Sequence, residues 1–205
     1  MKHGTILDVA CGKGATTRRL LNYYRPENVT GINITEKQLE RCRANAPGCA
    51  FLLMDATRLD FPDESFDNIM CVEAASGFDT EADFLREAHR VLKPGGRLVL
   101  CDAIFTPRPG MRTWRYAVLE ANYVADTDEY RQRCLEAGFE EAEVHDISAH
   151  TWDGFSSHLE DHMEEGLESG AYDRRAYTGI MHWLDSLERA FDWYALAVCK
   201  KSDSG

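Results

Sequence analysis

Residues 6–14 read ILDVACGKG. The apolar run at 6–9 favours a buried strand, and the glycines allow a tight turn before a helical pattern at 15–24 that Pro26 closes. Backbone N–H groups in such a turn can approach a ligand with no side chain in between. The stretch therefore predicts strand, turn and helix, with the turn as a candidate cofactor cradle. A plain tight connection between strand and helix is the alternative.

The same alternation continues along the chain. Further strands are predicted at 29–34, 50–54, 66–72 and 97–101, with helical patterns at 36–46 and 80–92. Thr35 is a candidate N-cap, and Pro94-Gly95-Gly96 ends the second of these helices. Strands that alternate with helices form a parallel sheet covered on both faces. The predicted fold class is α/β, doubly wound.

The regular alternation of strands and helices changes after Asp102. Helical patterns occupy 111–125 and 128–137, a strand is predicted at 141–147, and two helices between 152 and 190 break around 166–170 before a last strand at 191–199. We expect these two helices to cap the catalytic face. One domain is predicted over 1–205, with a cofactor-binding half at 1–102, an acceptor-side half at 103–190, a helical cap at about 152–190 and a final strand at 191–200.

Charge and composition exclude several classes of function. Lys and Arg number 23 against 35 Asp and Glu, and the net charge of −12 repels nucleic-acid phosphates. No apolar run approaches the roughly 20 residues of a membrane helix, and no signal peptide follows Met1. The seven scattered cysteines are expected to be reduced thiols. We expect a cytoplasmic protein with no nucleic-acid or membrane partner.

The residues around the turn indicate the kind of ligand. A dinucleotide fingerprint would place a third glycine where this chain has Thr17, so NAD and FAD are disfavoured, and an NAD oxidoreductase is only a third hypothesis. Asp8 places a carboxylate where it would repel a phosphate and attract an ammonium or sulfonium group. Asn33 and Gln38 could bond ribose hydroxyls; polar residues that merely face solvent at a helix start are the alternative.

Four blocks resemble motifs of the class I S-adenosylmethionine-dependent methyltransferases. They are residues 6–14, 29–35, 55–67 and 87–96, in the order and spacing of that family. The second half is similar to the subfamily that methylates sugars, sterols, polyketides and other natural products. The resemblance implies a Rossmann-like sheet of seven strands, mostly parallel with an antiparallel last strand, plus a helical cap. It also implies S-adenosylmethionine as cofactor, S-adenosylhomocysteine as product, and O-, N- or C-methylation of a small-molecule acceptor in secondary metabolism.

The resemblance also assigns residues to parts of the cofactor. The glycine turn and Asp8 would hold the methionine end of the cofactor, and Glu73 would line the same end from another strand. Asn33 would contact the ribose and Asp55 the adenine. The full set of cofactor residues is Asp8, Ala10, Cys11, Gly12, Gly14, Asn33, Ile34, Gln38, Asp55, Ala56, Glu73 and Ala74.

Two departures from the family pattern affect the expected site. Family members usually carry one or two helices before the first motif, whereas here the first strand begins about five residues from Met1. We therefore expect an unusually open site. Either the chain is a shortened form of the family, or the helices of 152–190 or a partner subunit cover the cofactor, and a homodimer is one option. The small residues at 73–78 predict a wider pocket or a missing base. A cofactor-binding homologue without methyl transfer, a cyclase or scaffold, is accordingly the second hypothesis.

Methyl transfer from a sulfonium is an in-line displacement that needs positioning and no metal. An aliphatic hydroxyl acceptor also needs a general base. The candidates are Asp102, for which a helix-capping role is the alternative, and His150. His145 is expected to be packed or solvent-facing and His89 to be exposed. His158 and His162 have helical metal-ligand spacing, but the glutamate that follows the first histidine in zinc proteases is missing, as is a third ligand, so no metal site is predicted.

Overall fold

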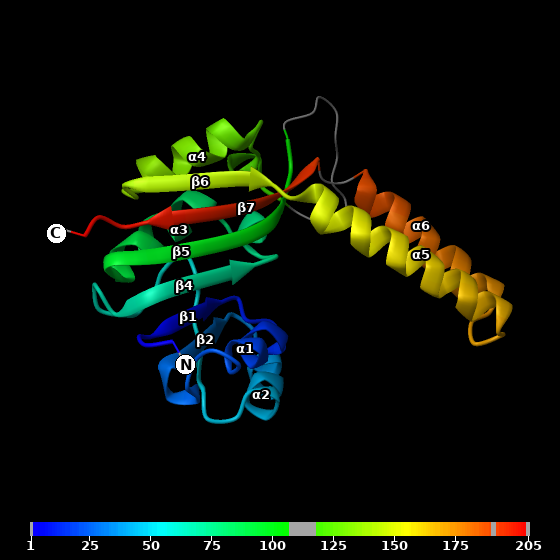
Figure 1. Ribbon diagram of the computed structural model, residues 1–205, viewed down its shortest axis with the longest axis horizontal. Coiled ribbons are helices and arrows are strands. Elements are labelled where there is room, and N and C mark those ends of the chain that lie inside the picture. Colours follow the sequence, from blue (N-terminus) through cyan, green and yellow to red (C-terminus); the bar gives the residue numbers. More distant parts are fainter. Residues whose placement is uncertain (1, 107–117, 190–191, 204–205) are drawn as a thin grey trace.

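The computed structural model describes residues 2–106, 118–189 and 192–203. Seven strands form one sheet in the order β3-β2-β1-β4-β5-β7-β6 (Figure 1). Neighbours among β1 to β5 pair in parallel, while β7 runs antiparallel to both β5 and β6. This confirms the predicted fold class and the antiparallel last strand. The strands are β1 Ile6–Val9, β2 Val29–Asn33, β3 Ala50–Leu53, β4 Phe66–Val72, β5 Leu92–Ile104, β6 Glu141–Asp146 and β7 Trp193–Lys200.

In the described part of the chain, six α-helices connect or extend these strands. Three of them begin at side-chain caps, because Thr80 accepts the Asp83 N–H at 3.1 Å, Asp126 the Glu129 N–H at 2.9 Å and Asp173 the Ala176 N–H at 2.7 Å. Thr35 occupies the N-cap position as predicted, but its side chain makes no capping hydrogen bond. The helices are α1 Ala15–Leu20, α2 Glu36–Asn45, α3 Glu81–Val91, α4 Thr127–Glu136, α5 Trp152–Glu168 and α6 Arg174–Glu188. Short 3₁₀ turns lie at η1 Pro26–Asn28, η2 Ala75–Gly77, η3 Glu120–Asn122 and η4 Ser148–His150.

The main core lies between the sheet and the helices α3 and α4. Alternate residues of β1, β4, β5 and β7 pack there against Phe84 and Leu85 of α3 and Tyr130 of α4. On the opposite face, α2 covers the β2–β3 end through Leu39, Cys42 and Phe51. Both faces of the sheet therefore bury apolar side chains, as a doubly wound sheet requires.

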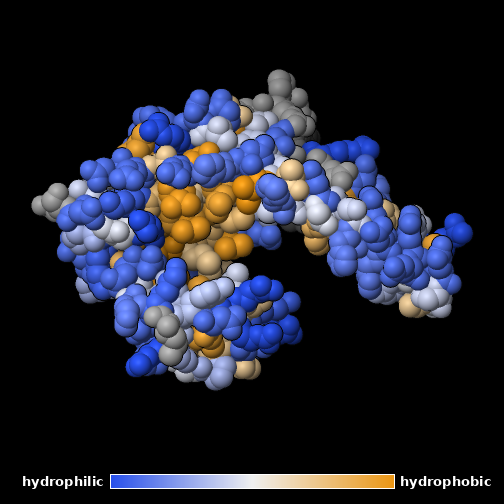
Figure 2. Space-filling view, in the orientation of Figure 1, coloured by the Kyte–Doolittle hydropathy of each residue, from blue (hydrophilic) through white to orange (hydrophobic). Residues whose placement is uncertain are grey.

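The face opposite α3 is partly open over β4, β5 and β7. The strand register aligns two cross-strand rows of half-buried residues on this face: Met70, Val99 and Val198, and next to them Val72, Cys101 and Leu196. Figure 2 shows a continuous apolar area at this place. We call these six residues the open apolar face.

Helices α5 and α6 form an antiparallel pair that projects from the sheet as an arm (Figure 1). The arm starts beyond β6 and returns to β7, at the edge where β4 ends. It extends away from this edge instead of lying on it. Its predicted role as a cap over the catalytic face stays a prediction. Within the described residues, no helix has the length and apolar character to span a membrane.

Three predicted boundaries were wrong. The first helix ends at Leu20, because the amides of Tyr23 and Tyr24 both donate to the Leu20 carbonyl and form turns. Strand β5 begins at Leu92, so it includes the Pro-Gly-Gly segment that was predicted to precede it. Of the helix predicted at 111–125, residues 111–117 lie outside the described residues. The rest forms only η3, because tertiary hydrogen bonds such as that from the Val124 N–H to the Phe105 carbonyl override helical propensity.

Candidate active site

The glycine turn follows β1 and adopts left-handed backbone conformations. Ala10, Gly12 and Gly14 have φ angles of 54°, 55° and 82°. A Cβ at Gly14 would lie 3.0 Å from the Cys42 Cα, so glycine is needed there for packing against α2. A Cβ at Gly12 would meet nothing within 4 Å. The turn is therefore closed by packing on the Gly14 side and open on the Gly12 side.

Asp8 precedes this turn and has 1% of its surface exposed. Its Oδ2 accepts a hydrogen bond from Thr17 Oγ1 at 2.5 Å, and its Oδ1 has no donor among the described residues. Burial raises the pKa of Asp8 to about 6, and the Thr17 hydrogen bond only partly offsets this rise. Within the described residues, Asp8 is thus a buried carboxyl group without a cationic partner, which precedes the turn and is bonded to the helix that follows it.

The residues expected around the ribose follow β2. Asn33 Nδ2 donates to Gln38 Oε1 at 2.8 Å, and Asn33 Oδ1 accepts the Thr35 N–H at 3.0 Å. Ile34 is 73% exposed. Cys11, whose N–H donates to the Ile32 carbonyl, joins the turn to β2. The structure brings Asn33 and Gln38 together beside the turn, and their role toward a ribose stays a prediction.

The two residues expected at the adenine follow β3. Asp55 is exposed, and its Oδ1 accepts hydrogen bonds from the N–H and the hydroxyl of Thr57, both at 2.9 Å. Ala56 is buried in the main core. Asp55 therefore forms a side-chain turn at the surface, next to a residue that anchors the loop.

Asp102, one of the two candidate bases, is buried near the end of β5. Its Oδ2 accepts the Ser76 N–H at 2.8 Å and its Oδ1 accepts the Ala103 N–H at 2.9 Å. Burial raises the pKa of Asp102 to about 6 despite these hydrogen bonds. The carboxylate thus fixes η2 to β5. His150, the other candidate, is exposed in η4 at the base of the arm, so the two candidates stand at different strand ends.

Three other histidines lie away from this edge or contact other side chains. His145 is exposed on β6. His89 is half-buried, contrary to prediction, because its ring packs edge-on against Phe139 with centroids 5.3 Å apart. On the arm, His162 Nε2 lies 2.9 Å from the Tyr172 hydroxyl. Across the part of the chain that the structure describes, no three His, Cys, Asp or Glu side chains gather as metal ligands.

Sequence reasoning missed two residues of this region. Asn122 is buried, accepts the Glu81 N–H at 2.9 Å and donates to the Phe78 carbonyl at 2.7 Å, so it fixes the segment after β4. Tyr194 on β7 donates to Glu73 Oε1 at 2.6 Å. Asn122 had been assigned to a helix, and no local pattern links Tyr194 to Glu73.

The predicted cofactor residues share one edge of the sheet. The glycine turn, Asn33, Asp55 and Glu73 lie at the carboxyl ends of β1, β2, β3 and β4, which are parallel neighbours. Figure 2 shows the molecule hollowed between this edge and the arm. Ligands of open α/β sheets bind outside the carboxyl ends of the strands. The hollow is therefore the candidate active site.

Comparison with known proteins shows a likeness to methyltransferases. A model described as "Methyltransferase domain" matches residues 7–100, the segment that builds this edge. The 27-O-demethylrifamycin SV methyltransferase of Amycolatopsis mediterranei (strain S699) is 33% identical over 177 residues, which are 80% of this chain and 65% of that protein. The chain is therefore similar to methyltransferases along most of its length, and its residues 7–100 match a methyltransferase domain.

Other methyltransferases are similar over different spans. The 2-methyl-6-phytyl-1,4-hydroquinone methyltransferase of Synechocystis is 44% identical over 101 residues, which are 48% of this chain and 31% of that protein. The structure of Haemonchus contortus phosphoethanolamine N-methyltransferase 2 in complex with S-adenosyl-L-methionine aligns with a TM-score of 0.81 at 17% identity, over 98% of this chain and 50% of that one. The chain thus spans between about a third and two thirds of the length of these proteins.

Proposed function

We propose that the chain binds S-adenosylmethionine at the β1 turn and transfers its methyl group to a small-molecule acceptor. The observation that carries the proposal is the buried Asp8 carboxyl, which has one oxygen without a donor among the described residues and precedes a turn that is open at Gly12. The likeness to methyltransferases and the small-molecule acceptors named for its relatives support the same assignment.

The residues at the turn fit the amino-acid end of this cofactor. An ammonium beside Asp8 would supply the cationic partner that the carboxyl lacks, and would favour its ionised form. The open side at Gly12 leaves room for a ligand against backbone N–H groups. A pyrophosphate fits less well, because Asp8 would repel it and Thr17, bonded to Asp8, takes the place of the third glycine.

The bound cofactor supplies an electrophilic methyl group on a positively charged sulfur. The chain's own part is to hold the cofactor at the edge of the sheet and to position an acceptor in the hollow, since orientation accounts for much of the barrier reduction in such a displacement. For a hydroxyl acceptor, Asp102 or His150 would take the proton. Asp102 would need η2 to move, because both of its oxygens accept backbone N–H groups.

We further propose that the acceptor is a natural-product type of molecule, with the methyl group going to O, N or C, and that the protein works in the cytoplasm. A chain of net charge −12 is a poor partner for nucleic acid. A homodimer that covers the open side of the site is part of the same proposal.

Calorimetric titration with S-adenosylmethionine and S-adenosylhomocysteine tests the cofactor site. The wild-type chain is expected to bind both, and Asp8→Asn to weaken both by about tenfold or more, as for the loss of one partly buried ion pair. Absence of binding to the wild type would refute the proposal. Incubation with tritiated cofactor and a panel of phenols, long-chain alcohols and amines then tests transfer. Cofactor binding without transfer to any of them would favour the cyclase or scaffold alternative.

A further inference from the structure

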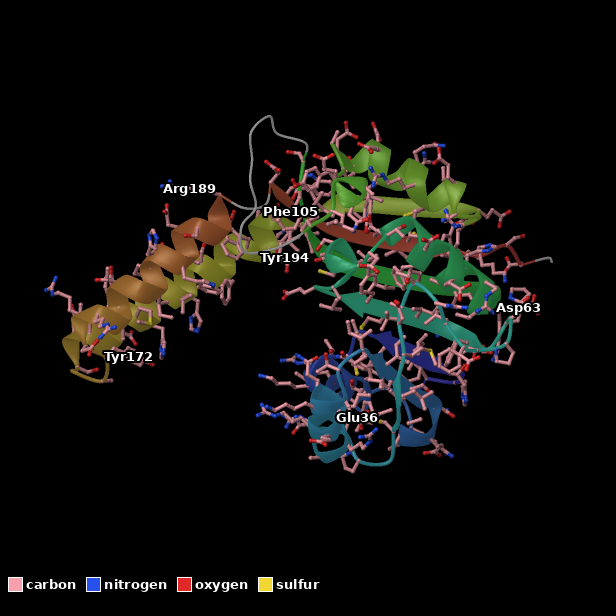
Figure 3. The ribbon with its side chains drawn as sticks, turned by 180° about the vertical axis from the view of Figure 1, so that it is seen from behind. Glu36, Asp63, Phe105, Tyr172, Arg189 and Tyr194 are labelled. Carbon is pink, nitrogen blue, oxygen red and sulfur yellow. The ribbon has the colours of Figure 1, made fainter. Side chains whose placement is uncertain are left out.

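A tyrosine and a glutamate from distant parts of the chain meet at the carboxyl edge of the sheet. Tyr194 near the start of β7 donates its hydroxyl to Glu73 Oε1 at 2.6 Å, and Glu73 is the first residue after β4. The two residues are 121 positions apart and meet because only β5 separates β4 from β7. Figure 3 places Tyr194 where the arm joins the sheet. We call these two residues the Tyr–Glu pair.

The strand register places the Glu73 backbone beside the glycine turn. Glu73 has a φ of 54°, a left-handed conformation that is unfavourable for a non-glycine residue, and its N–H donates to the Cys101 carbonyl at 2.8 Å. Ala10, which follows the neighbouring strand β1, has the same φ. Because Val9 pairs with Cys71, the two turns stand side by side, about one strand spacing of 5 Å apart. Glu73 therefore borders the turn that we propose holds the amino-acid end of the cofactor.

The Tyr–Glu pair presents a negative charge with one unengaged oxygen. Tyr194 is only 8% exposed, and its burial, together with the hydrogen bond to Glu73, raises the pKa of its phenol. The phenol therefore stays protonated and remains a donor at neutral pH. The Glu73 side chain is exposed, and its Oε2 accepts no hydrogen bond within the described residues.

We propose that Glu73, held in place by Tyr194, distinguishes the charged methyl donor from its neutral product. The inference rests on the proposed function, since S-adenosylmethionine carries a sulfonium where S-adenosylhomocysteine has an uncharged thioether. A carboxylate close to that sulfur attracts the donor and exerts no comparable pull on the product. Glu73 is thus a specificity-determining residue and Tyr194 its positioning residue, and the pair limits inhibition by the product.

Calorimetry with three probes tests the pair without any acceptor. S-adenosylmethionine and sinefungin, which bears an amine in place of the methylsulfonium, are compared with S-adenosylhomocysteine. Glu73→Gln is expected to weaken binding of the two charged probes about fivefold, as for one charge pair near water, and to leave S-adenosylhomocysteine within about twofold. Tyr194→Phe is expected to change the ratio in the same direction by about twofold, because the carboxylate is less well fixed.

Two matched variants separate this effect from general disturbance. Glu64 is an exposed glutamate with a φ of 58° that precedes β4 at its opposite end, so Glu64→Gln should leave the ratio of affinities unchanged. Tyr130→Phe removes another Tyr–Glu hydrogen bond, to Glu81 in the main core, and should also leave the ratio unchanged.

The outcomes distinguish the inference from the function on which it rests. If the wild type binds none of the probes, the proposed function is wrong. If it binds them and Glu73→Gln changes all affinities equally or not at all, only the inference is wrong. The wild type provides a test that needs no variant, because added salt should weaken binding of the charged donor more than that of the product. Equal salt dependence of the two affinities would overturn the inference.

Discussion

At the scale of single residues, Gly12 and Gly14 are expected to respond differently to the same substitution. Gly14→Ala should lower the free energy of unfolding by about 2 kcal/mol or more, because it adds contact with the Cys42 backbone to left-handed strain. Gly12→Ala should cost only about 1 kcal/mol of strain. Its methyl group, however, enters the open side of the turn and should weaken S-adenosylhomocysteine binding about tenfold. Urea unfolding and calorimetry measure both quantities. Undiminished affinity in Gly12→Ala would place the ligand elsewhere.

The raised pKa of Asp8 gives a pH dependence of stability with a definite sign. The folded chain holds this proton to about pH 6, whereas an unfolded aspartate releases it near pH 4. Between these values the folded state binds more protons, so the contribution of Asp8 to stability falls as pH rises. Above pH 6 the cost reaches up to about 3 kcal/mol, which Asp8→Asn should remove. Urea unfolding of both proteins from pH 4 to 8 should show that the free energy of unfolding of the variant increases relative to that of the wild type as pH rises. A constant difference would contradict this assignment.

Residues with local signals were predictable from sequence, and residues joined by the sheet order were not. Asp8 and the glycines stand next to each other in the chain, so their types and spacing were sufficient to predict a cradle. Tyr194 and Glu73 meet only through the order of β4, β5 and β7. His89 was expected to be exposed because its helical position alone did not reveal the Phe139 ring beside it.

At the scale of elements, Tyr172 closes the arm at its tip. Tyr172 packs on Gly166 of α5 so closely that a Cβ there would lie 2.1 Å from its ring, and Figure 3 shows Tyr172 at the far end of the arm. Gly166→Ala should displace Tyr172 and loosen the hairpin, so that hydrogen exchange speeds up in α5 and α6 and stays unchanged in β4 and β5.

Gly154 in the same helix provides the control. A Cβ there would meet nothing within 4 Å, so Gly154→Ala should stabilise α5 by about 0.5–1 kcal/mol through helix propensity. If Gly166→Ala slowed exchange in the arm as well, Tyr172 would not be what closes the tip.

Elements with strong hydrophobic periodicity and clear glycine or proline boundaries were predicted well, including the two helices of the arm. Segment 118–125 was not, because the fold uses Asn122 as a side-chain bridge between η2 and α3. The residues that Asn122 bonds lie more than 40 positions away in the sequence. Local propensity carries no information about them.

At the scale of the whole molecule, the open apolar face predicts behaviour in solution. Contiguous exposed apolar areas favour association and bind apolar dyes. Leu196→Thr should reduce the fluorescence of bound 8-anilinonaphthalene-1-sulfonate and the self-association seen in sedimentation. Leu53→Thr, at a leucine that is 58% exposed on β3 outside this face, should change neither. Equal effects of the two variants would show that this face has no special role.

The order of the sheet also affects how the protein is made. Strand β7 follows β6 in the chain but lies between β5 and β6. When the chain has left the ribosome only through α6, β1 to β5 can therefore already pair. Strand β6 still lacks a neighbouring strand, and α4 lacks the completed sheet on which it packs. Nascent chains should accordingly gain protease resistance in two steps, and the second should wait until residues 193–200 have left the exit tunnel.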